Sequence, residues 1–341
     1  MANDMEINNP LALILYCIDE KYRRSHSDPF CKLKDEEVDW GKVLSIAEKN
    51  KLSYSFSQRI VKERCLFNSR LYEALVKGRE NISKLRRTLN FIFALFEQLG
   101  RELIIIKLYK GLPYITYDVD VLVREEDFQD IAQTLERQGM VNLAEVTRFK
   151  AVKSLQYRRY EGVFWKNGLL QIELYTDFSW AGLPSLDSSV VWESPRRVDI
   201  HGIKCPIPSR EADILLLLNH ALFKDGNITL LDFLYINSLL KKNVNFSELF
   251  HEAEKYGWGN SLLALISTLR NTYQIIYQSE PMPSNIKFPY AVPLSLISHS
   301  VWKLLFTSMT RRDRIHPFTL LGYGLFFGLT IKDRYIKSPS G

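Results

Sequence analysis

The sequence predicts an α+β protein, with a small mixed β-sheet flanked by helical segments toward the N- and C-terminal ends of the chain. Three observations support this prediction. An apolar pattern of helical period over 78–99 leads directly into a β-branched run that starts at residue 103. Two further β-rich runs, 117–123 and 169–178, follow and are bounded by turn residues. From residue 209 onward the apolar pattern is helical again.

Composition and charge are those of an ordinary core-forming protein. The 341 residues are 46% hydrophobic and 25% charged, and the net charge is +6. This mild positive excess permits an anionic substrate such as a nucleotide or RNA, but it requires none. The length gives room for two or three domains. We divide the chain into an N-terminal helical segment (1–100), an α/β core (101–205) and a C-terminal helical domain with an apolar tail (206–341).

The ends of the chain and its cysteines predict a cytoplasmic protein. The run 11–18 has no basic region before it, so it makes a poor signal peptide. The uncharged stretch 317–331 is fifteen residues long, which is short for a membrane span. We therefore expect no transmembrane span, and a buried or docked tail is favoured over contact with a membrane surface. The four cysteines are far apart and form no CxxC pair, which favours reduced thiols over a structural zinc site.

The N-terminal segment ends in the strongest helical pattern of the chain. Apolar residues from Ile82 to Leu99 recur at steps of three and four, and Gly100 is placed to stop the helix. The apolar run from Leu103 to Ile106 follows at once and predicts a buried strand. Gly111 and Pro113 then break the pattern before the second β-rich run begins.

Two carboxylates interrupt this second strand. Side chains alternate across a strand, so Asp118 and Asp120 face the same way, about 7 Å apart along the chain. Two like charges in an apolar strand repel each other and lose solvation, unless a cation neutralises them. Mg²⁺ is the natural partner, because it is held by one or two carboxylates together with substrate phosphates. The alternative is a strand end whose two acids are simply solvated.

The next two β-rich runs predict a hairpin. Val163–Trp165 and Leu169–Phe178 flank Lys166-Asn167-Gly168. Asn-Gly at this place is typical of a type I′ turn, in which both central residues have positive φ. Glu173 lies in the middle of the second strand and adds another carboxylate to the same sheet.

The C-terminal part is predicted to be helical. Ser209 is a good N-cap, and the apolar runs 214–222 and 230–240 predict two buried helices. His220 and Asp232 lie on these helices, where we expect a hydrogen-bonded core pair rather than catalytic groups.

Two groups of basic residues leave a further alternative open. They lie in 145–160 and in the Arg311–Arg314 cluster. A solvated face is the ordinary interpretation. If they instead bind RNA, the affinity should fall steeply with salt.

Several common phosphate-site motifs are absent, including GxxxxGK[ST] and a GxGxxG turn after a strand. What remains is Lys110-Gly111, a short loop, the Asp-x-Asp strand and then Glu173 on a later strand. This order resembles the nucleotidyltransferase superfold of the DNA polymerase β type. Within it, the chain resembles the large family of uncharacterised bacterial and archaeal nucleotidyltransferases with a Leu-Lys-Gly…Asp-Ile-Asp-Leu-Leu-Val signature. The resemblance covers roughly residues 38–240.

The resemblance implies a Mg²⁺-dependent transfer of a nucleoside monophosphate from an NTP, such as ATP, to a hydroxyl of an acceptor. The acceptor is a small molecule, a protein or an RNA. Asp118 and Asp120 would bind two Mg²⁺ ions, and Glu173 would complete the metal site and help to deprotonate the acceptor. Gly111 would let the backbone approach the β- and γ-phosphates, with Lys110 as a nearby point charge.

The sequence also departs from the family pattern. Leu112 stands where many of these enzymes have serine, Tyr175 stands where the family usually has histidine, and an arginine before the acid pair is missing. An alternative is therefore a weak or inactive nucleotide-binding module on the same fold. Lys107, just after the first strand, is expected to be structural.

Overall fold

The computed structural model describes residues 10–26, 28–29, 38–64, 68–143, 162–180, 183–225 and 228–279. The basic residues of 145–160, the Arg311–Arg314 cluster and the apolar stretch 317–331 lie outside the described residues.

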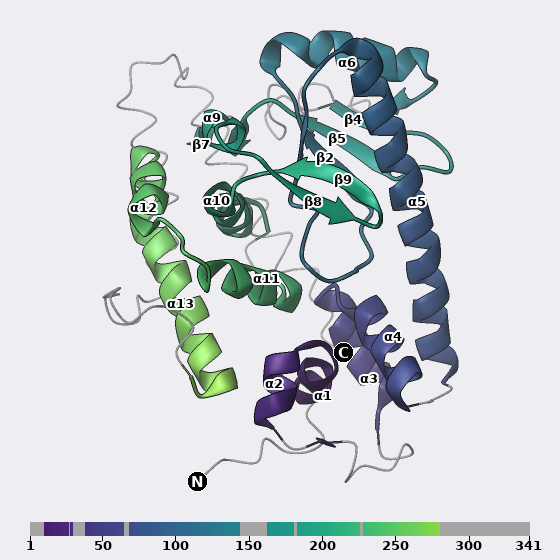
Figure 1. The fold of residues 1–341 in the computed structure, drawn as a ribbon, viewed down its shortest axis with the longest axis vertical. Helices are drawn as coiled ribbons and strands as arrows, with labels where there is room; N and C mark the ends of the chain where they lie inside the picture. The colour runs from purple at the N-terminus through teal and green to yellow at the C-terminus, as the bar shows by residue number, and fades with distance from the viewer. Residues whose placement is uncertain are drawn as a thin grey trace, which may run out of the picture.

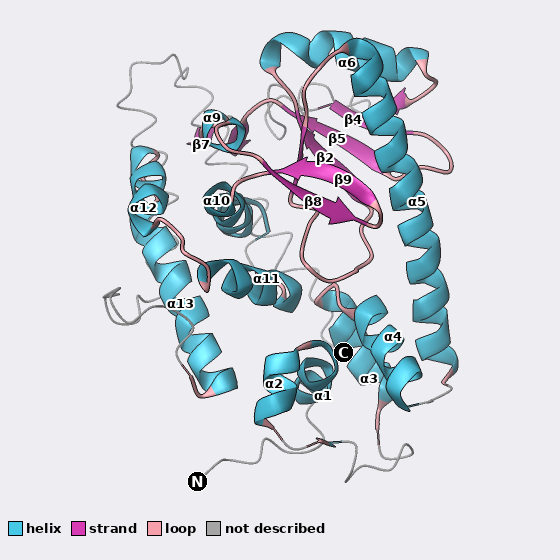
Figure 2. Cartoon of the chain, in the orientation of Figure 1, coloured by secondary structure: helices cyan, strands magenta, loops and turns pink. Residues whose placement is uncertain are grey.

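The main sheet is mixed and has five strands in the order β1-β2-β5-β4-β3. Figure 2 shows its strands β2, β5 and β4 side by side. Strand β1 (Ile104–Ile106) is antiparallel to β2 (Asp118–Leu122), and β2 is parallel to β5 (Gln171–Tyr175). Strand β5 pairs antiparallel with β4 (Gly162–Trp165), which pairs with β3 (Val141–Asn142). The predicted α+β class with a small mixed sheet is confirmed.

The hairpin predicted at Asn167-Gly168 is present, but its turn is of another type. The backbone N–H of Leu169 donates to the carbonyl of Lys166 at 3.2 Å, which closes the turn. Gly168 has φ 84°, whereas Asn167 does not have a positive φ. A single positive φ at the third turn position is the pattern of a type II turn. The prediction of a type I′ turn was wrong, because Gly168 alone has the positive φ that reverses the chain.

Two further hairpins flank the sheet. One joins β6 (Phe178–Trp180) to β7 (Leu183–Leu186), and the other joins β8 (Arg196–Ile200) to β9 (Ile203–Ile207). Strand β9 packs against β1 and the long helix α5, so the β8–β9 hairpin extends the cover of the sheet.

The C-terminal half of helix α5 (Ser69–Leu99) lies along one side of the sheet, and its N-terminal half extends beyond the sheet and packs against the helices that precede it (Figure 1). It begins at Ser69 rather than at Gly78, because the side chain of Asn68 caps it by accepting from the N–H of Arg70. As expected, it ends at Gly100, which has φ 63°.

The remaining helices belong to the two ends of the described chain. On the N-terminal side they are α1 (Pro10–Ile18), α2 (Glu20–Ser25), α3 (Trp40–Lys49) and α4 (Ser53–Arg64). Within the core they are the 3₁₀ turn η3 (Glu125–Asp127), α6 (Phe128–Arg137) and α9 (Ser189–Trp192). On the C-terminal side they are α10 (Arg210–His220), the π-helical turn η4 (Ala221–Asp225), α11 (Leu230–Leu240), α12 (Phe246–Lys255) and α13 (Gly259–Tyr277). Ser209 caps α10 as expected, through a 3.1 Å hydrogen bond from the N–H of Ala212.

The two faces of the sheet pack against different parts of the chain. Val119 and Val121 join an apolar cluster with α5 and α6. Ile104, Ile106 and Leu122 join a second cluster that contains both the N-terminal and the C-terminal helices. The two helical segments therefore share one core, and the sheet carries the acid pair toward them. The boundaries proposed near residues 100 and 205 stay a prediction.

No helix in the described part of the chain has the length and apolar character needed to cross a membrane.

Candidate active site

The register of the central strands places three carboxylates on one face of the sheet. Asp120 on β2 is the direct partner of Glu173 on β5, and Asp118 is the partner of Gln171. Paired residues on neighbouring strands project from the same face. Asp118, Asp120 and Glu173 therefore share a face, while Val119 is fully buried on the opposite one.

A side chain from α5 fixes the entry to the acidic strand. The amide of Asn81 makes two hydrogen bonds with the backbone of Thr116, one from the Thr116 N–H at 3.0 Å and one to the Thr116 carbonyl at 2.5 Å. The hydroxyl of Thr116 donates to Oδ1 of Asp118 at 3.3 Å. Asn81 and Thr116 are buried. The position of Asp118 thus depends on a helix that precedes it by many residues.

A partly buried lysine lies against the acid pair. Nζ of Lys107 is 3.0 Å from Oδ2 of Asp120, with the two side chains 13% and 11% exposed. The same ammonium is 3.1 Å from the hydroxyl of Tyr175 and 4.6 Å from the centre of its ring. The Tyr175 hydroxyl in turn donates to Oε2 of Glu173 at 2.8 Å. Lys107 is therefore a charge partner of the acid pair, a role that the sequence analysis missed.

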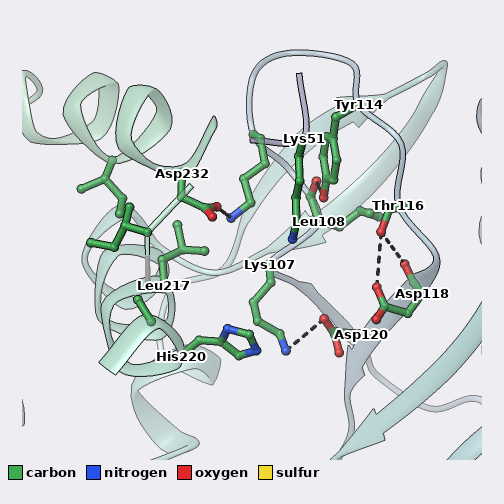
Figure 3. A pocket seen from close by; sticks show the side chains of 14 residues that line it. Lys51, Lys107, Leu108, Tyr114, Thr116, Asp118, Asp120, Leu217, His220 and Asp232 are labelled. Carbon is green, nitrogen blue, oxygen red and sulfur yellow. Dashed lines mark hydrogen bonds and ion pairs between the residues drawn. The ribbon is translucent and has the colours of Figure 1, made fainter. Parts of the chain in front are cut away.

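A pocket of about 270 Å³ opens in front of these groups (Figure 3). Its wall combines the segment after β1, the acidic strand, the turn after α3 and the helices α10 and α11. The charged and polar residues that line it are Lys51, Lys107, Lys110, Tyr114, Thr116, Asp118, Asp120, His220 and Asp232. The pocket thus draws on the N-terminal segment, the α/β core and the C-terminal helices of the described chain. Glu173 lies outside this lining but beside Asp120 in the sheet.

Lys110 lines the pocket, but its ammonium is already paired. Nζ of Lys110 lies 2.7 Å from Oδ1 of Asp232, and the lysine side chain is only 5% exposed. The hydroxyl of Thr229 donates to Oδ2 of Asp232 at 2.6 Å. Asp232, which the sequence places in a core pair with His220, forms an ion pair with Lys110, and both His220 and Asp232 line the pocket.

Burial alone would raise the pKa of the Asp232 carboxyl. The Lys110 ammonium, the Thr229 hydroxyl and the more distant charge of Lys51 outweigh it, so the pKa lies below its usual value. Asp232 is therefore ionised at neutral pH.

One hydrogen bond from α4 and one within the loop fix the segment between β1 and β2. The hydroxyl of Ser55 on α4 hydrogen-bonds the carbonyl of Pro113, and the hydroxyl of Tyr114 donates to the carbonyl of Leu108 at 2.9 Å. Burial raises the pKa of the Tyr114 phenol well above its usual value, and the carboxylates of Asp232, Asp118 and Asp120 raise it further. Tyr114 therefore stays a neutral hydrogen-bond donor.

Gly111 lies in this loop with φ 74°, and a Cβ added there would meet no atom within 4 Å. A left-handed backbone with open space beside it is suited to the close approach of a ligand.

The three carboxylates suit a hard divalent cation, since Mg²⁺ prefers oxygen ligands. Among the described residues, however, no three His, Cys, Asp or Glu side chains form a ready-made ligand set in this structure, and the ammonium of Lys107 lies on Asp120. The chemistry of the site fits a metal, provided that Lys107 gives up this carboxylate. Asp118, Asp120 and Glu173 as metal ligands stay a prediction.

Comparison with known proteins shows the family to which the chain belongs. A family model described as an uncharacterised nucleotidyltransferase matches residues 36–274, which is more than half of the chain. The protein is thus a nucleotidyltransferase. It belongs to the family that this model defines, as the sequence resemblance implied.

Similarity to solved structures is remote. A putative nucleotidyltransferase from Thermotoga maritima is 16% identical, with a TM-score of 0.30 over 41% of this chain and 89% of that one. The lincosamide antibiotic adenylyltransferase LnuA, solved with lincomycin bound, is 14% identical, with a TM-score of 0.30 over 45% and 94%. The antibiotic-resistance factor ANT(2'')-Ia is 11% identical, with a TM-score of 0.36 over 55% and 96%. These values carry no inference about substrate. A comparison with curated proteins finds no match.

Proposed function

We propose that the protein moves a nucleoside monophosphate from an NTP to a hydroxyl of an acceptor, in a Mg²⁺-dependent reaction. The observation that supports this most strongly is the shared face of Asp118, Asp120 and Glu173 beside a pocket with three lysines. A triphosphate donor requires two kinds of group. Carboxylates hold the divalent cations, and ammonium groups offset the charge of the phosphates.

In the proposed reaction, the acceptor oxygen forms a bond to the α-phosphorus and the bond to the leaving pyrophosphate breaks. The carboxylate of Glu173 takes the proton of the acceptor hydroxyl. Its orientation for this task is set by Tyr175, which donates to Oε2, and by Gln171, which donates to Oε1 at 3.1 Å. Mg²⁺ held by Asp118, Asp120 and Glu173 would supply neutralisation of the phosphate charge.

The free side of Gly111 gives the phosphate tail room to approach the backbone of the loop. Lys107 and Lys110 bring two ammonium groups to the same wall, where they reduce the electrostatic repulsion between the phosphates and the acid pair. Positioning and charge neutralisation are the main contributions in this class of reaction.

The direct test is incubation of the protein with NTPs labelled at the α-phosphate, Mg²⁺ and a cell extract, followed by separation by size. Label should appear with at least one of the four NTPs and should disappear when Mg²⁺ is chelated. The size of the labelled species then identifies the acceptor as a small molecule, a protein or an RNA. If no NTP gives Mg²⁺-dependent label, the proposal is rejected.

The Lys107–Asp120 contact also favours a second candidate, a nucleotide-binding module without turnover. If the ammonium stays on Asp120 when a nucleotide binds, the metal lacks one of its ligands. Calorimetry with a non-hydrolysable NTP analogue separates the two functions. Tight binding without transfer supports the module, whereas measurable turnover rejects it.

A further inference from the structure

Two of the pocket lysines have an unusual backbone conformation. Four non-glycine residues in the described part of the chain have positive φ, and they are Lys51 (59°), Lys107 (60°), His201 and Gln278. Residues with a Cβ adopt this left-handed region at a cost, and glycine or asparagine adopts it more readily. Two of these four residues with a strained backbone are thus lysines, and both line the same pocket. Backbone strain of this kind concentrates at functional sites.

Lys51 follows the last turn of α3, at the position where helices most often have glycine. Its N–H donates to the carbonyl of Glu48 at 3.0 Å, and the N–H of Leu52 reaches back to Ala47 at 2.7 Å. The side chain of Asn50 accepts from the N–H of Leu230 at 2.9 Å, which ties the end of α3 to the start of α11. Backbone hydrogen bonds and the side chain of Asn50 therefore hold Lys51 at the pocket wall, and the side chain of Lys51 takes no part in them.

The charge environment distinguishes Lys51 from its neighbours. Lys107 pairs with Asp120 and Lys110 pairs with Asp232. Within the residues that the structure describes, Lys51 makes no ion pair of its own, although it is exposed into the same pocket (Figure 3). Its ammonium is therefore available for an anion that enters the pocket without the loss of an existing contact.

We propose that Lys51 binds the phosphate tail of the NTP, so that the N-terminal helices supply part of the nucleotide site. This inference rests on the proposed function, since it assigns a part of the same site. A lysine at this position costs conformational energy that glycine would avoid, and it offers three donors to phosphate oxygens. The side chain lines the same pocket as the acid pair and Asp232, where phosphates need an added positive charge.

The test uses inorganic tripolyphosphate as the probe, with binding to the full chain measured by calorimetry in the absence of metal. Lys51→Gly removes the ammonium and relieves the backbone. The dissociation constant should rise roughly 10- to 100-fold, the usual effect of losing one charge-assisted hydrogen bond. The melting temperature should hold or rise, because glycine suits this φ. If a merely structural role explained Lys51, tripolyphosphate affinity would be unchanged.

Two further variants complete the test. Lys51→Arg keeps the charge and should retain most of the affinity. Lys49→Gln removes an exposed lysine at the end of α3 that does not line the pocket, and it should leave affinity unchanged. Equal affinity of Lys51→Gly and the unchanged protein, or no binding of tripolyphosphate to either, overturns the inference. Loss of affinity in Lys51→Gly, together with no label transfer by the unchanged protein, supports the inference and rejects only the proposed reaction.

Discussion

The ammonium of Lys107 and the carboxylate of Asp120 form a largely buried ion pair at 3.0 Å, in the place where the sequence predicts a metal. Asp120 lines the pocket and lies directly beside Glu173 in the register of β2 and β5. An ammonium and a divalent cation satisfy the same carboxylate in the same way, so they compete for it. This relationship decides how the stability and the metal affinity of the protein are coupled.

Replacement of Lys107 by methionine should therefore have two opposite effects. Mg²⁺ affinity should increase by roughly 10-fold, because a competing cation has been removed next to the ligands. The metal-free protein should lose about 3 kcal/mol of stability, because the buried Asp120 carboxylate loses its ion pair with the Lys107 ammonium. Calorimetry with Mg²⁺ and thermal unfolding without metal measure the two effects. Lys49→Met is the control, and unchanged or weaker Mg²⁺ affinity in Lys107→Met would contradict the competition.

Asparagine substitutions should separate the catalytic and structural roles of the acid pair. Asp118→Asn and Asp120→Asn should each reduce transfer by about three orders of magnitude or more, since several kcal/mol of transition-state stabilisation are lost. From the sequence alone, removal of one of two repelling carboxylates is expected to hold or raise the melting temperature. The ion pair reverses this expectation for Asp120, because Asp120→Asn removes the carboxylate that pairs with the Lys107 ammonium. Asp118→Asn keeps its acceptor for Thr116 and should unfold near the original temperature.

Label transfer and thermal unfolding of the same preparations check this pair of predictions. Glu173→Gln should reduce transfer as well, but less if a water replaces one ligand. A folded Asp120→Asn protein that transfers at the original rate would remove the acid pair from the mechanism.

The Lys110–Asp232 pair predicts a particular dependence of stability on pH. The pKa of Asp232 is lowered in the folded protein, so its contribution is present above the unfolded value of about 3.9 and is lost as pH falls through the folded value. At pH 7, Asp232→Asn should lower the free energy of unfolding by roughly 3 kcal/mol. The difference between the two proteins should shrink as the pH falls below about 4. Urea unfolding between these pH values measures it, and a difference independent of pH would show that the ion pair is not the cause.

Gly111→Ala tests whether the phosphate tail passes the loop after β1. Alanine at φ 74° should cost about 1 kcal/mol of stability without a clash, because no atom lies near the added Cβ. A bound triphosphate would meet that methyl group, so KM for the NTP should rise about 10-fold or more. Gly168→Ala is a matched control, since it has φ 84° and equally open space at the β4–β5 turn. Equal KM values for the two variants would place the triphosphate elsewhere.

Local signals in the sequence predicted much of the fold. The spacing of Leu85 and Leu89, the stop at Gly100 and the Asn167-Gly168 turn each act over a few residues, and the corresponding elements are present. The β8–β9 hairpin was missed. Pro206 within its second strand is atypical of a paired strand, which concealed an otherwise regular alternation.

The candidate site was less predictable, because its contacts join residues far apart in the chain. The alternation of Asp118 and Asp120 is a local property, but the register that sets Asp120 beside Glu173 is not. The pairing of Lys110 with Asp232 depends on how α11 packs against the loop after β1. The left-handed backbone of Lys107 has no signal in its neighbours.

The most direct test of the proposed site is a crystal soaked with Mn²⁺, as a visible substitute for Mg²⁺, and a non-hydrolysable NTP analogue. We expect metal density in contact with Asp118, Asp120 and Glu173, the phosphate tail beside Gly111, and the Lys107 ammonium moved away from Asp120. A bound analogue with no metal at these carboxylates, and with Lys107 still paired to Asp120, would contradict the proposed metal-dependent transfer.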